Sequence, residues 1–390
     1  MADSLYGRVE QVGRERLVPR HLSKKAPIRH LDLSLLLVVS ALSLVGAVAI
    51  YSATRTGLTS LNRDPHFFLK RQLAFLALAL IAFLVMLLFD YRQLRGLAPL
   101  IYAAGLGMLI LVLSPAGHTT AGAQRWINLG PLQMQPSEMT KIVLIVALAA
   151  LCASERVPTG GARMVLALAL TALPAALVHL QPDLGTVLLM GAIVLTVLLV
   201  AGIRGRWLAV LMAAAAAAVA LVLQLGLLHD YQVARLTAFL DDKADLQLAG
   251  YNLAQSKIAI GSGGLVGKGL FRGTQTNLDY VPHQHTDFIF TVIGEEMGFV
   301  GSLAVVGLFS FLSWRCLRIA VLSKDRFGTY LAAGIAGMFV FQTFVNIGMT
   351  IGIIPITGIP LPFVSYGGSS LLTSFMAAGL LMNVHMRRFV

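Results

Sequence analysis

The sequence predicts an all-α polytopic membrane protein with about ten transmembrane helices. Of its 390 residues, 57% are hydrophobic and only 12% are charged, and the mean hydropathy is +0.79. A soluble domain of this length does not need so much apolar sequence. The apolar segments approach the roughly 20 residues that a helix needs to cross the hydrocarbon core, and none alternates like a barrel strand. The expected spans are 33–52, 72–90, 98–114, 139–153, 164–180, 184–202, 207–228, 288–311, 328–354 and 363–385.

Residues 1–32 form a basic tail, and residues 33–390 are expected to form a single membrane domain. The first apolar run, from Leu33 to Ile50, is long enough to span the membrane, although small residues within it resemble a signal-peptide cleavage site. Asp32 is placed to cap the first turn of this helix. We therefore expect an uncleaved first helix.

The net charge of +12 comes from basic residues that are scattered between the apolar segments, which argues against nucleic-acid binding. Ten spans put both termini on one side, and the loops on the side of the basic tail carry more Lys and Arg overall. The positive-inside rule then predicts that both termini are cytoplasmic. The longest loop, from His229 to Thr286, connects the seventh and eighth spans on the opposite side. Long loops often carry function, so the working face is expected to be extracytoplasmic.

The first candidate cluster lies around the start of the fourth span. The helix can begin at Ser137 or Pro136, and Glu138 and Lys141 are then three residues apart on one helical face, where they can form an ion pair. Such a pair either faces a cavity or only locks the span to a neighbour. Upstream, Arg125 is suited to a diphosphate, and Trp126 is an interface anchor or a platform for substrate.

The second and third segments are weaker signals. Asp183 stands where the sixth span begins, and capping of that helix is preferred over catalysis. The glycine-rich stretch Gln255–Gly269 contains Lys257, Ser262 and Lys268. It matches neither a Walker loop nor G-x-G-x-x-G. Its backbone N–H groups and its lysines are nevertheless suited to an anion.

The segment His285-Thr286-Asp287 stands at the outer mouth of the eighth span. A carboxylate at a bilayer boundary costs free energy unless it is used or paired. Asp287 either caps the helix or takes part in catalysis, and its position alone does not decide between the two. Glu295 and Glu296 follow deeper in the span, where at least one of them should be protonated or paired.

The fourth segment, Pro355–Pro362, interrupts the chain between the ninth and tenth spans and is followed by Ser365, Tyr366 and Ser369. Irregular backbone near membrane depth is tolerated where it lines a cavity. A tight turn between the two spans is the alternative. The hydroxyl-bearing side chains favour the cavity.

These segments, in order along the chain, resemble the signature blocks of the SEDS (RodA/FtsW) family. The blocks are Gly-Ala-Gln-Arg-Trp-Ile from Gly122, Gln-Pro-Ser-Glu from Gln135, Gln-Pro-Asp-Leu-Gly-Thr from Gln181, Ala-Ile-Gly-Ser-Gly-Gly from Ala259, His-Thr-Asp-Phe-Ile-Phe from His285 and Ser-Tyr-Gly-Gly-Ser-Ser from Ser365. The run from Gly273 to Pro282 looks more like the elongation (RodA) branch than the division (FtsW) branch. His283 is a departure, because the family commonly has Glu at this position.

The resemblance implies a glycosyltransferase that polymerises lipid II, an undecaprenyl diphosphate-linked disaccharide peptide, into peptidoglycan strands on the outer face of the bacterial cytoplasmic membrane. It implies that Asp287 is the catalytic residue, which we expect to act as general base in an inverting transfer. No cofactor is required by the sequence, although a divalent cation could assist. The candidate substrate-binding residues are Arg125, Trp126, Glu138, Lys141, Lys257, Ser262, Lys268, His285, Thr286, Ser365, Tyr366 and Ser369.

Two other functions fit part of the sequence. A flippase for the lipid-linked precursor would use the same cavity, but it needs ionisable residues that reach the inner side. An ion-coupled transporter would explain the charged residues within spans, but not the long polar loop before Asp287. The outer loops are too small to hold a transpeptidase, so the resemblance suggests a class B penicillin-binding protein as a partner.

Overall fold

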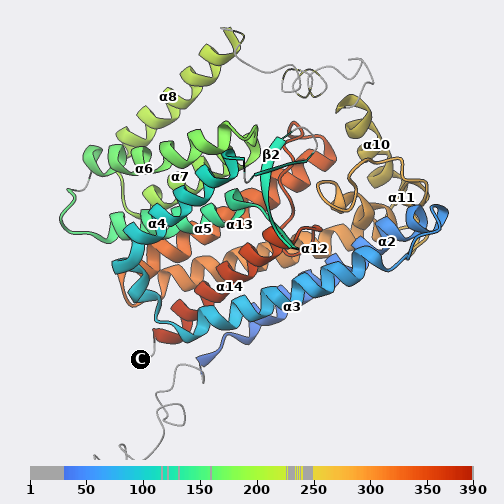
Figure 1. The fold of residues 1–390 in the computed structure, drawn as a ribbon, viewed down its shortest axis with the longest axis horizontal. Coiled ribbons are helices and arrows are strands. Elements are labelled where there is room, and N and C mark those ends of the chain that lie inside the picture. The colour runs from blue at the N-terminus through green and yellow to red at the C-terminus, as the bar shows by residue number, and fades with distance from the viewer. Residues whose placement is uncertain are drawn as a thin grey trace, which may run out of the picture.

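The computed structural model describes residues 30–388 except for 116, 121–122, 131, 159, 225, 227–232, 234, 236, 238 and 240–248. Nearly all of the predicted basic tail, 1–32, therefore lies outside the described residues. The chain forms a helical bundle in which α2 and α3 lie along one side (Figure 1). The helices are α2 (Leu33–Ser60), α3 (Phe67–Leu88), α4 (Tyr91–Leu113), α5 (Pro136–Ala153), α6 (Gly161–His179), α7 (Leu184–Val200), α8 (Gly205–Gln224), α10 (Ala249–Ser262), α11 (Thr274–Asn277), α12 (Ile289–Val321), α13 (Arg326–Ile351) and α14 (Gly368–Arg387).

A helix overlaps each of the ten predicted spans. Seven of the described helices are long and apolar enough to cross a membrane, and α7 and α8 contain shorter apolar stretches. The prediction of a helical multi-pass membrane protein is therefore confirmed. Asp32 caps α2 as expected, because its Oδ1 accepts a hydrogen bond from the N–H of Leu35 at 3.2 Å. The count of ten crossings and the cytoplasmic termini stay predictions.

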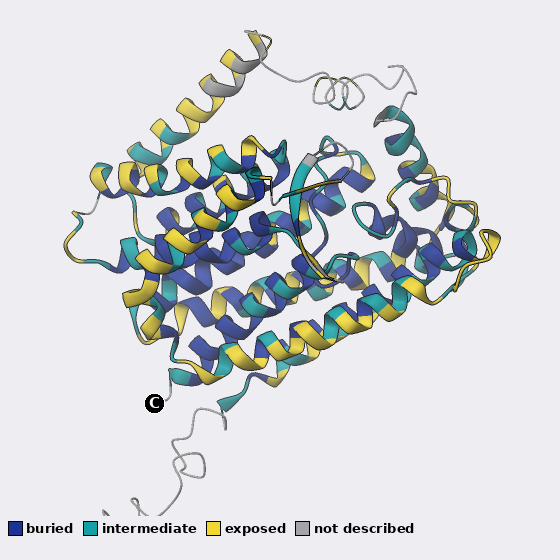
Figure 2. Ribbon diagram, viewed as in Figure 1, coloured by how far each residue is buried: buried dark blue, intermediate teal, exposed yellow. Residues whose placement is uncertain are grey.

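The helices α5 and α13 form the centre of the bundle. Over an apolar stretch of 18 residues in each helix, 78% of the residues of α5 and 67% of those of α13 are buried inside the protein, against 17% in α3 and 22% in α4. Figure 2 shows the same division, with buried residues in the interior and exposed residues along the outer helices. An apolar face left exposed in this way is stable when it contacts lipid. The central helices are therefore the rigid frame on which polar residues can be held.

Two elements depart from the predicted all-α fold with one long outer loop. Strands β1 (His118–Thr120), β2 (Ala123–Leu129) and β3 (Leu132–Met134) form a small antiparallel sheet between α4 and α5. Strands β1 and β3 have three residues each, too few for an alternating pattern to stand out from a loop. The loop predicted over 229–286 contains the helices α10 and α11. Residues 255–262, predicted as part of a glycine-rich loop, are thus helical.

The long helix α12 is broken at Gly298, whose φ of 65° and ψ of −162° lie outside the helical region. The break removes helical partners from nearby backbone groups, and the segment after α10 replaces them. The N–H groups of residues 268–269 donate to the carbonyls of residues 295–296, both at 3.0 Å. The N–H groups of residues 299–300 donate to the carbonyls of residues 264–265, at 2.9 and 3.0 Å. Every one of these groups would be costly to leave unpaired at membrane depth.

This pairing depends on two glycines that meet at the break. A Cβ added to Gly298 would lie 2.2 Å from the backbone nitrogen of Gly267, and a Cβ added to Gly267 would lie 2.1 Å from the carbonyl oxygen of Glu296. Both glycines also have positive φ, which other residues adopt at a cost. The glycine-rich stretch therefore serves the broken helix, whereas the sequence predicted that its N–H groups face an anion.

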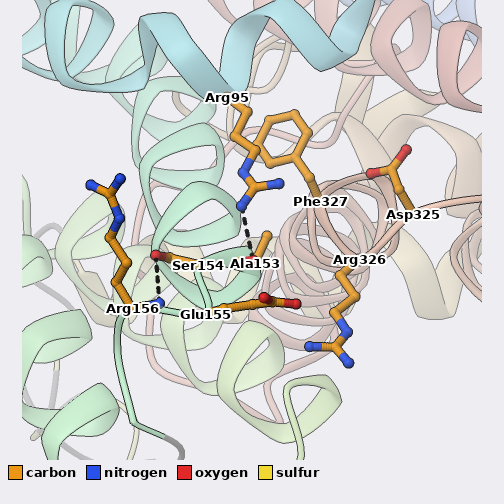
Figure 3. A pocket seen from close by; sticks show the side chains of 8 residues that line it. All are labelled: Arg95, Ala153, Ser154, Glu155, Arg156, Asp325, Arg326 and Phe327. Carbon is orange, nitrogen blue, oxygen red and sulfur yellow. Dashed lines mark hydrogen bonds between the residues drawn. The ribbon is translucent and has the colours of Figure 1, made fainter.

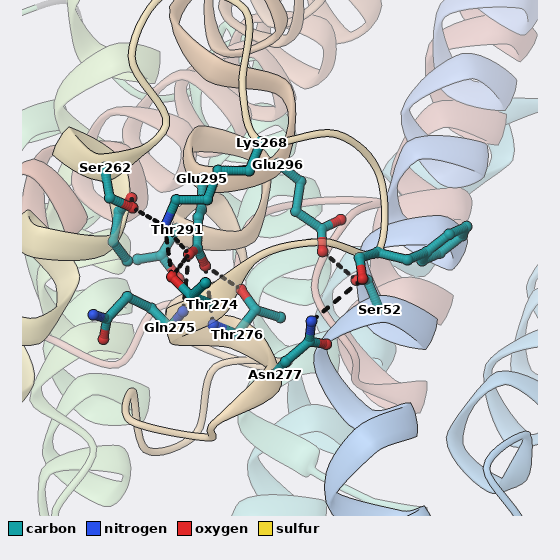
Figure 4. A network of polar contacts seen from close by, with 12 residues as sticks. Ser52, Ser262, Lys268, Thr274, Gln275, Thr276, Asn277, Thr291, Glu295 and Glu296 are labelled. Carbon is teal, nitrogen blue, oxygen red and sulfur yellow. Dashed lines mark hydrogen bonds and ion pairs between the residues drawn. The ribbon is translucent and has the colours of Figure 1, made fainter.

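A network of hydrogen bonds and an ion pair surrounds Glu295 and Glu296, just before the break in α12 (Figure 4). The buried carboxylate of Glu295 pairs with Lys268 Nζ at 2.8 Å and accepts hydrogen bonds from the N–H groups of residues 275–276, at 2.8 and 2.9 Å. Glu296 accepts a hydrogen bond from the hydroxyl of Ser52 at 2.5 Å. The expectation that these adjacent carboxylates need partners is confirmed.

Gly298→Ala is expected to destabilise the protein by at least about 2 kcal/mol, because the new methyl group meets backbone atoms and the residue keeps a positive φ. Thermal unfolding of the purified protein in detergent measures the change. Gly307→Ala is the control, because Gly307 lies on the same helix and a Cβ added there would have no neighbouring atom within 4 Å. Equal melting temperatures for the two variants would show that the break does not depend on glycine.

Candidate active site

A polar cavity of about 650 Å³ lies at one end of the bundle, around the N-terminal ends of α5 and α7, strand β2 and the segments before α12 and α14. It brings together the first, second and fourth of the segments that the sequence singled out, together with the segment that carries Asp287. Residues 357–360 form part of its wall, so the irregular backbone between α13 and α14 lines a cavity as predicted. Of the predicted site residues, the cavity is lined by Arg125, Trp126, Glu138, Lys141, Thr286, Asp287, Tyr366 and Ser369.

The backbone around Asp287 is held by three donors from α13 and the segment before α14. The carbonyl of His285 accepts from the Tyr366 N–H at 2.9 Å, and that of Thr286 accepts from the Ser365 hydroxyl at 2.6 Å. The carbonyl of Asp287 accepts from the side-chain amide of Asn346 at 2.9 Å. Because three successive carbonyls are bound, the backbone that carries the Asp287 side chain is held at the cavity wall.

The side chain of Asp287 does not cap α12. Phe288 occupies the N-cap position of that helix and makes no side-chain capping hydrogen bond, and among the described residues the Asp287 carboxylate accepts no hydrogen bond from the first turn. Burial raises the pKa of the Asp287 carboxyl above its usual range, and the nearby positive charges of His283, Arg235 and Arg125 only partly oppose this effect. A carboxylate with a raised pKa is a stronger proton acceptor. The geometry therefore favours a chemical role over the capping role.

Asp183 has both a structural role and a place in the cavity. Its Oδ1 accepts from the Thr186 N–H at 3.1 Å, and its Oδ2 accepts from the Thr186 hydroxyl at 2.9 Å. The predicted cap of the sixth span, α7, is therefore confirmed. The side-chain amide of Gln135 donates to the same Oδ2 at 3.3 Å, which connects the start of α7 to the start of α5.

Glu138 and Lys141 form the predicted ion pair. Lys141 Nζ lies 2.6 Å from Glu138 Oε2 in the first turns of α5, and both residues are buried. They also line the cavity, so the pair faces a cavity, which was the first of the two alternatives that the sequence left open. Removing one partner of a buried pair leaves an uncompensated charge, which typically costs about 3–5 kcal/mol. This pair holds charge beside the cavity without adding net charge to it.

Two arginines contribute positive charge to the cavity. Arg125 on β2 donates from Nε to the carbonyl of Gln181 at 2.7 Å and from Nη2 to the carbonyl of Pro182. These bonds give partners to two backbone carbonyls in the turn between α6 and α7, and they fix the guanidinium at the cavity wall. Arg235 is a second guanidinium in the lining, and it was not among the predicted site residues.

Two predicted residues support the cavity without lining it. The ring of His285 packs against Phe68 and Tyr366, with centroids 4.9 and 5.5 Å apart. Burial lowers the pKa of His285 to about 4, so the imidazole is neutral at pH 7. The hydroxyl of Ser365 donates to the backbone carbonyl of Thr286 and accepts a hydrogen bond from the N–H of Leu361. Both act on the position of the segment that carries Asp287.

The glycine-rich segment, which supplied three of the candidate substrate-binding residues, lies apart from this cavity. Lys268 is paired with Glu295 and also donates to the hydroxyl of Ser262 at 2.8 Å. The aliphatic chain of Lys257 lies against Gly352 at the end of α13. None of the three lines the cavity, because the segment wraps the break in α12.

Asn346 and Arg235 are the residues that sequence reasoning missed. Asn346 is fully buried in α13, and its amide bonds the carbonyls of Asp287 and Ile359 at 2.9 and 2.8 Å. An amide within an apolar span is a detectable signal, since polar groups at that depth need a reason. Arg235 carried no comparable signal. Among the described residues, no group of three or more His, Cys, Asp or Glu side chains is arranged to hold a metal ion.

The fold and this cavity define a multi-pass membrane protein with a buried polar site at one end of its helices. A family model described as "Cell cycle protein", the FtsW/RodA/SpoVE family, matches residues 32–389. The chain therefore belongs to the FtsW/RodA/SpoVE family, also called SEDS, as the sequence motifs predicted.

Curated relatives cover nearly the whole chain. Peptidoglycan glycosyltransferase MrdB of Escherichia coli (strain K12) is 38% identical over 359 residues, which is 92% of this chain and 94% of that protein. Probable peptidoglycan glycosyltransferase FtsW of Trichlorobacter lovleyi is also 38% identical, over 93% of this chain and 95% of that protein. Stage V sporulation protein E of Bacillus subtilis is 36% identical, over 90% of this chain and 96% of that protein.

Solved structures show the same fold. A chain from a peptidoglycan synthase complex, described as coordinating polymerization and crosslinking, aligns with a TM-score of 0.78 at 34% identity, covering 92% of this chain and 98% of that one. The crystal structure of the rod shape determining protein RodA of Thermus thermophilus aligns with a TM-score of 0.68 at 33% identity, covering 92% and 98%. At these identities the likeness extends to the family as well as to the fold.

Replacing Glu138 or Lys141 singly by Ala is expected to destabilise the protein by about 3–5 kcal/mol, because each change leaves one buried charge unpaired. The double replacement should cost less than the sum of the two single changes. Thermal unfolding of the four proteins in detergent completes the double-mutant cycle. Strictly additive effects would mean that the two charges do not interact.

Proposed function

We propose that this chain is a peptidoglycan glycosyltransferase that polymerises lipid II into glycan strands, with Asp287 as the general base. The observation that carries the proposal is the cavity itself, where Asp287 has a raised pKa and a bound backbone. The chain belongs to a family in which MrdB and FtsW carry the name peptidoglycan glycosyltransferase. Membership of that family favours polymerisation over the flippase and transporter alternatives.

In the proposed reaction, the carboxylate of Asp287 takes the proton from the acceptor sugar hydroxyl. The acceptor oxygen attacks the anomeric carbon of the donor, and the bond from that carbon to the diphosphate breaks. A single displacement inverts the anomeric centre, so an α-linked donor becomes a β-linked glycan. The substrate cavity lies between helices, where the lipid tail of a membrane-bound precursor can remain in the bilayer.

The leaving diphosphate gains negative charge as the bond breaks, and positive groups fixed at the cavity wall stabilise that charge. We assign this role to Arg125 and Arg235, which both line the cavity near Asp287. The sequence suggested Lys257 and Lys268 as well, but both lie apart from the cavity. Arg125 is suited to the role because its bonds to the turn before α7 hold its guanidinium in place.

The topology and the biological branch complete the proposal. We assign residues 33–390 to one membrane domain, the cavity to the extracytoplasmic face and both termini to the cytoplasm, in line with the distribution of Lys and Arg. We also assign the chain to the elongation branch, because its run before Asp287 resembles RodA. A class B penicillin-binding protein is the proposed partner. Support comes from the similarity to a chain of a complex described by both polymerization and crosslinking.

Asp287→Asn is expected to abolish glycan synthesis, a loss of at least about 100-fold, since general-base catalysis contributes about 10²–10⁴-fold. Purified protein is incubated with lipid II, and product length is read on a gel. Asp279→Asn is the matched control, because Asp279 is an exposed acid upstream in the same connection and is not part of the cavity lining. Near-normal glycan synthesis by Asp287→Asn would refute the general-base assignment.

The pH profile tests the same role independently of any mutation. A carboxyl with a raised pKa stays protonated to a higher pH than an ordinary Asp, and the protonated form cannot accept a proton. Activity should therefore fall on acidification at a pH above the usual Asp pKa of about 3.9. The rate of glycan synthesis is measured against pH with a parallel check that the protein remains folded. An acid limb at or below that ordinary value would contradict a base with a raised pKa.

A further inference from the structure

A second cavity, of about 760 Å³, lies at the opposite end of the bundle from Asp287. Figure 3 shows the side chains that line it. The helices α5 and α13 connect the two sites. The residues Glu138 and Lys141 near the start of α5 line the Asp287 cavity, and Ala153 at its end lines the second one. Helix α13 runs the other way, from Arg326 at the second cavity to Asn346 beside Asp287. The second cavity is therefore separate from the proposed catalytic site.

Three arginines from three segments surround this cavity. Arg95 comes from the first turns of α4, Arg156 follows α5, and Arg326 begins α13. Figure 3 shows their side chains around the cavity. Nη2 of Arg95 donates to the carbonyl of Ala153 at 3.1 Å, which fixes that guanidinium at the wall. Within the described part of the chain, the guanidinium groups of Arg156 and Arg326 have no acidic partner within 4.0 Å.

The two acidic residues in the lining do not neutralise these charges. The carboxylate of Asp325 is already used, because it caps α13 through the N–H of Gly328 at 2.9 Å and lies 3.5 Å from Nε of Arg92. It also accepts a hydrogen bond from the hydroxyl of Tyr91. Glu155 then remains as one carboxylate against three guanidinium groups. The cavity has an excess of positive charge that an anion can compensate.

We propose that this cavity binds the phosphate group of an anionic ligand, either the headgroup of an anionic phospholipid or a soluble phosphate compound. Guanidinium groups present paired N–H donors that match phosphate oxygens. Basic pockets at the ends of membrane helices are suited to anionic headgroups, since those ends lie at the level of the lipid phosphates. The cavity volume of about 760 Å³ is large enough to hold a lipid headgroup.

The test uses the full-length protein in detergent, titrated at constant ionic strength with phosphatidylglycerol, phosphatidylcholine or inorganic phosphate. Native mass spectrometry counts the bound molecules. The wild type is expected to bind one phosphatidylglycerol more than the double variant Arg156→Gln, Arg326→Gln, or to bind it about tenfold more tightly. Phosphatidylcholine should bind equally to both proteins. A difference seen with inorganic phosphate and not with the lipid would instead identify a soluble anion as the ligand.

Arg204→Gln is the matched control, because it removes the same charge from the same end of the bundle but outside the cavity lining. It should bind every probe as the wild type does. Melting temperatures without ligand should agree among all variants, since the replaced side chains are exposed. If the double variant fails to fold, the two single variants replace it. Equal binding of every probe by wild type and cavity variants, or an equal loss in Arg204→Gln, overturns the proposal.

Discussion

Backbone groups at membrane depth have no water to bond, and this constraint explains most of the irregular structure in the protein. The break in α12 at Gly298 is closed by residues 264–269, which supply both donors and acceptors. The carbonyls of residues 285–287 are bound by α13 and by the segment before α14. The turn before α7 is bound by Arg125. Each of these three irregular segments is therefore bound by a partner from a distant part of the chain.

Buried charges follow the same rule. Glu138 is paired with Lys141 beside the candidate active site, and Glu295 is paired with Lys268 beside the broken helix. A charge removed from water is tolerated when an opposite charge and hydrogen bonds compensate it. Asp287 differs from these residues, because no cation within 4.0 Å holds its carboxylate among the described residues. A carboxylate without such a contact is available to accept a proton.

The segment that carries Asp287 combines a bound backbone with a carboxylate that has no ion-pair partner among the described residues. Its backbone is bound on one side by Asn346 and Ser365, and the helix that follows it is locked by the glycine-rich stretch. A catalytic base must keep its position relative to the substrate, since small displacements cost rate. The bonds around this segment provide that rigidity, while the carboxylate itself remains at the cavity wall.

The sequence by itself determined the helical membrane fold, the family and several of the residues that line the cavity. Apolar segments of the length of the bilayer and short motifs such as His285-Thr286-Asp287 are local features, so they can be read without a structure. Helix caps at Asp32 and Asp183 and the pair Glu138–Lys141 are also local, and all three were predicted correctly.

Only the tertiary structure decided which of these residues meet. The lysines of the glycine-rich stretch were candidates for substrate binding, whereas the stretch itself pairs with the break in α12 at residues 295–300. Asn346 and Arg235 reach Asp287 from positions 59 and 52 residues away in the sequence. Contacts of this kind depend on how helices pack, and a residue pattern within one segment contains no information about the partner that another segment will bring.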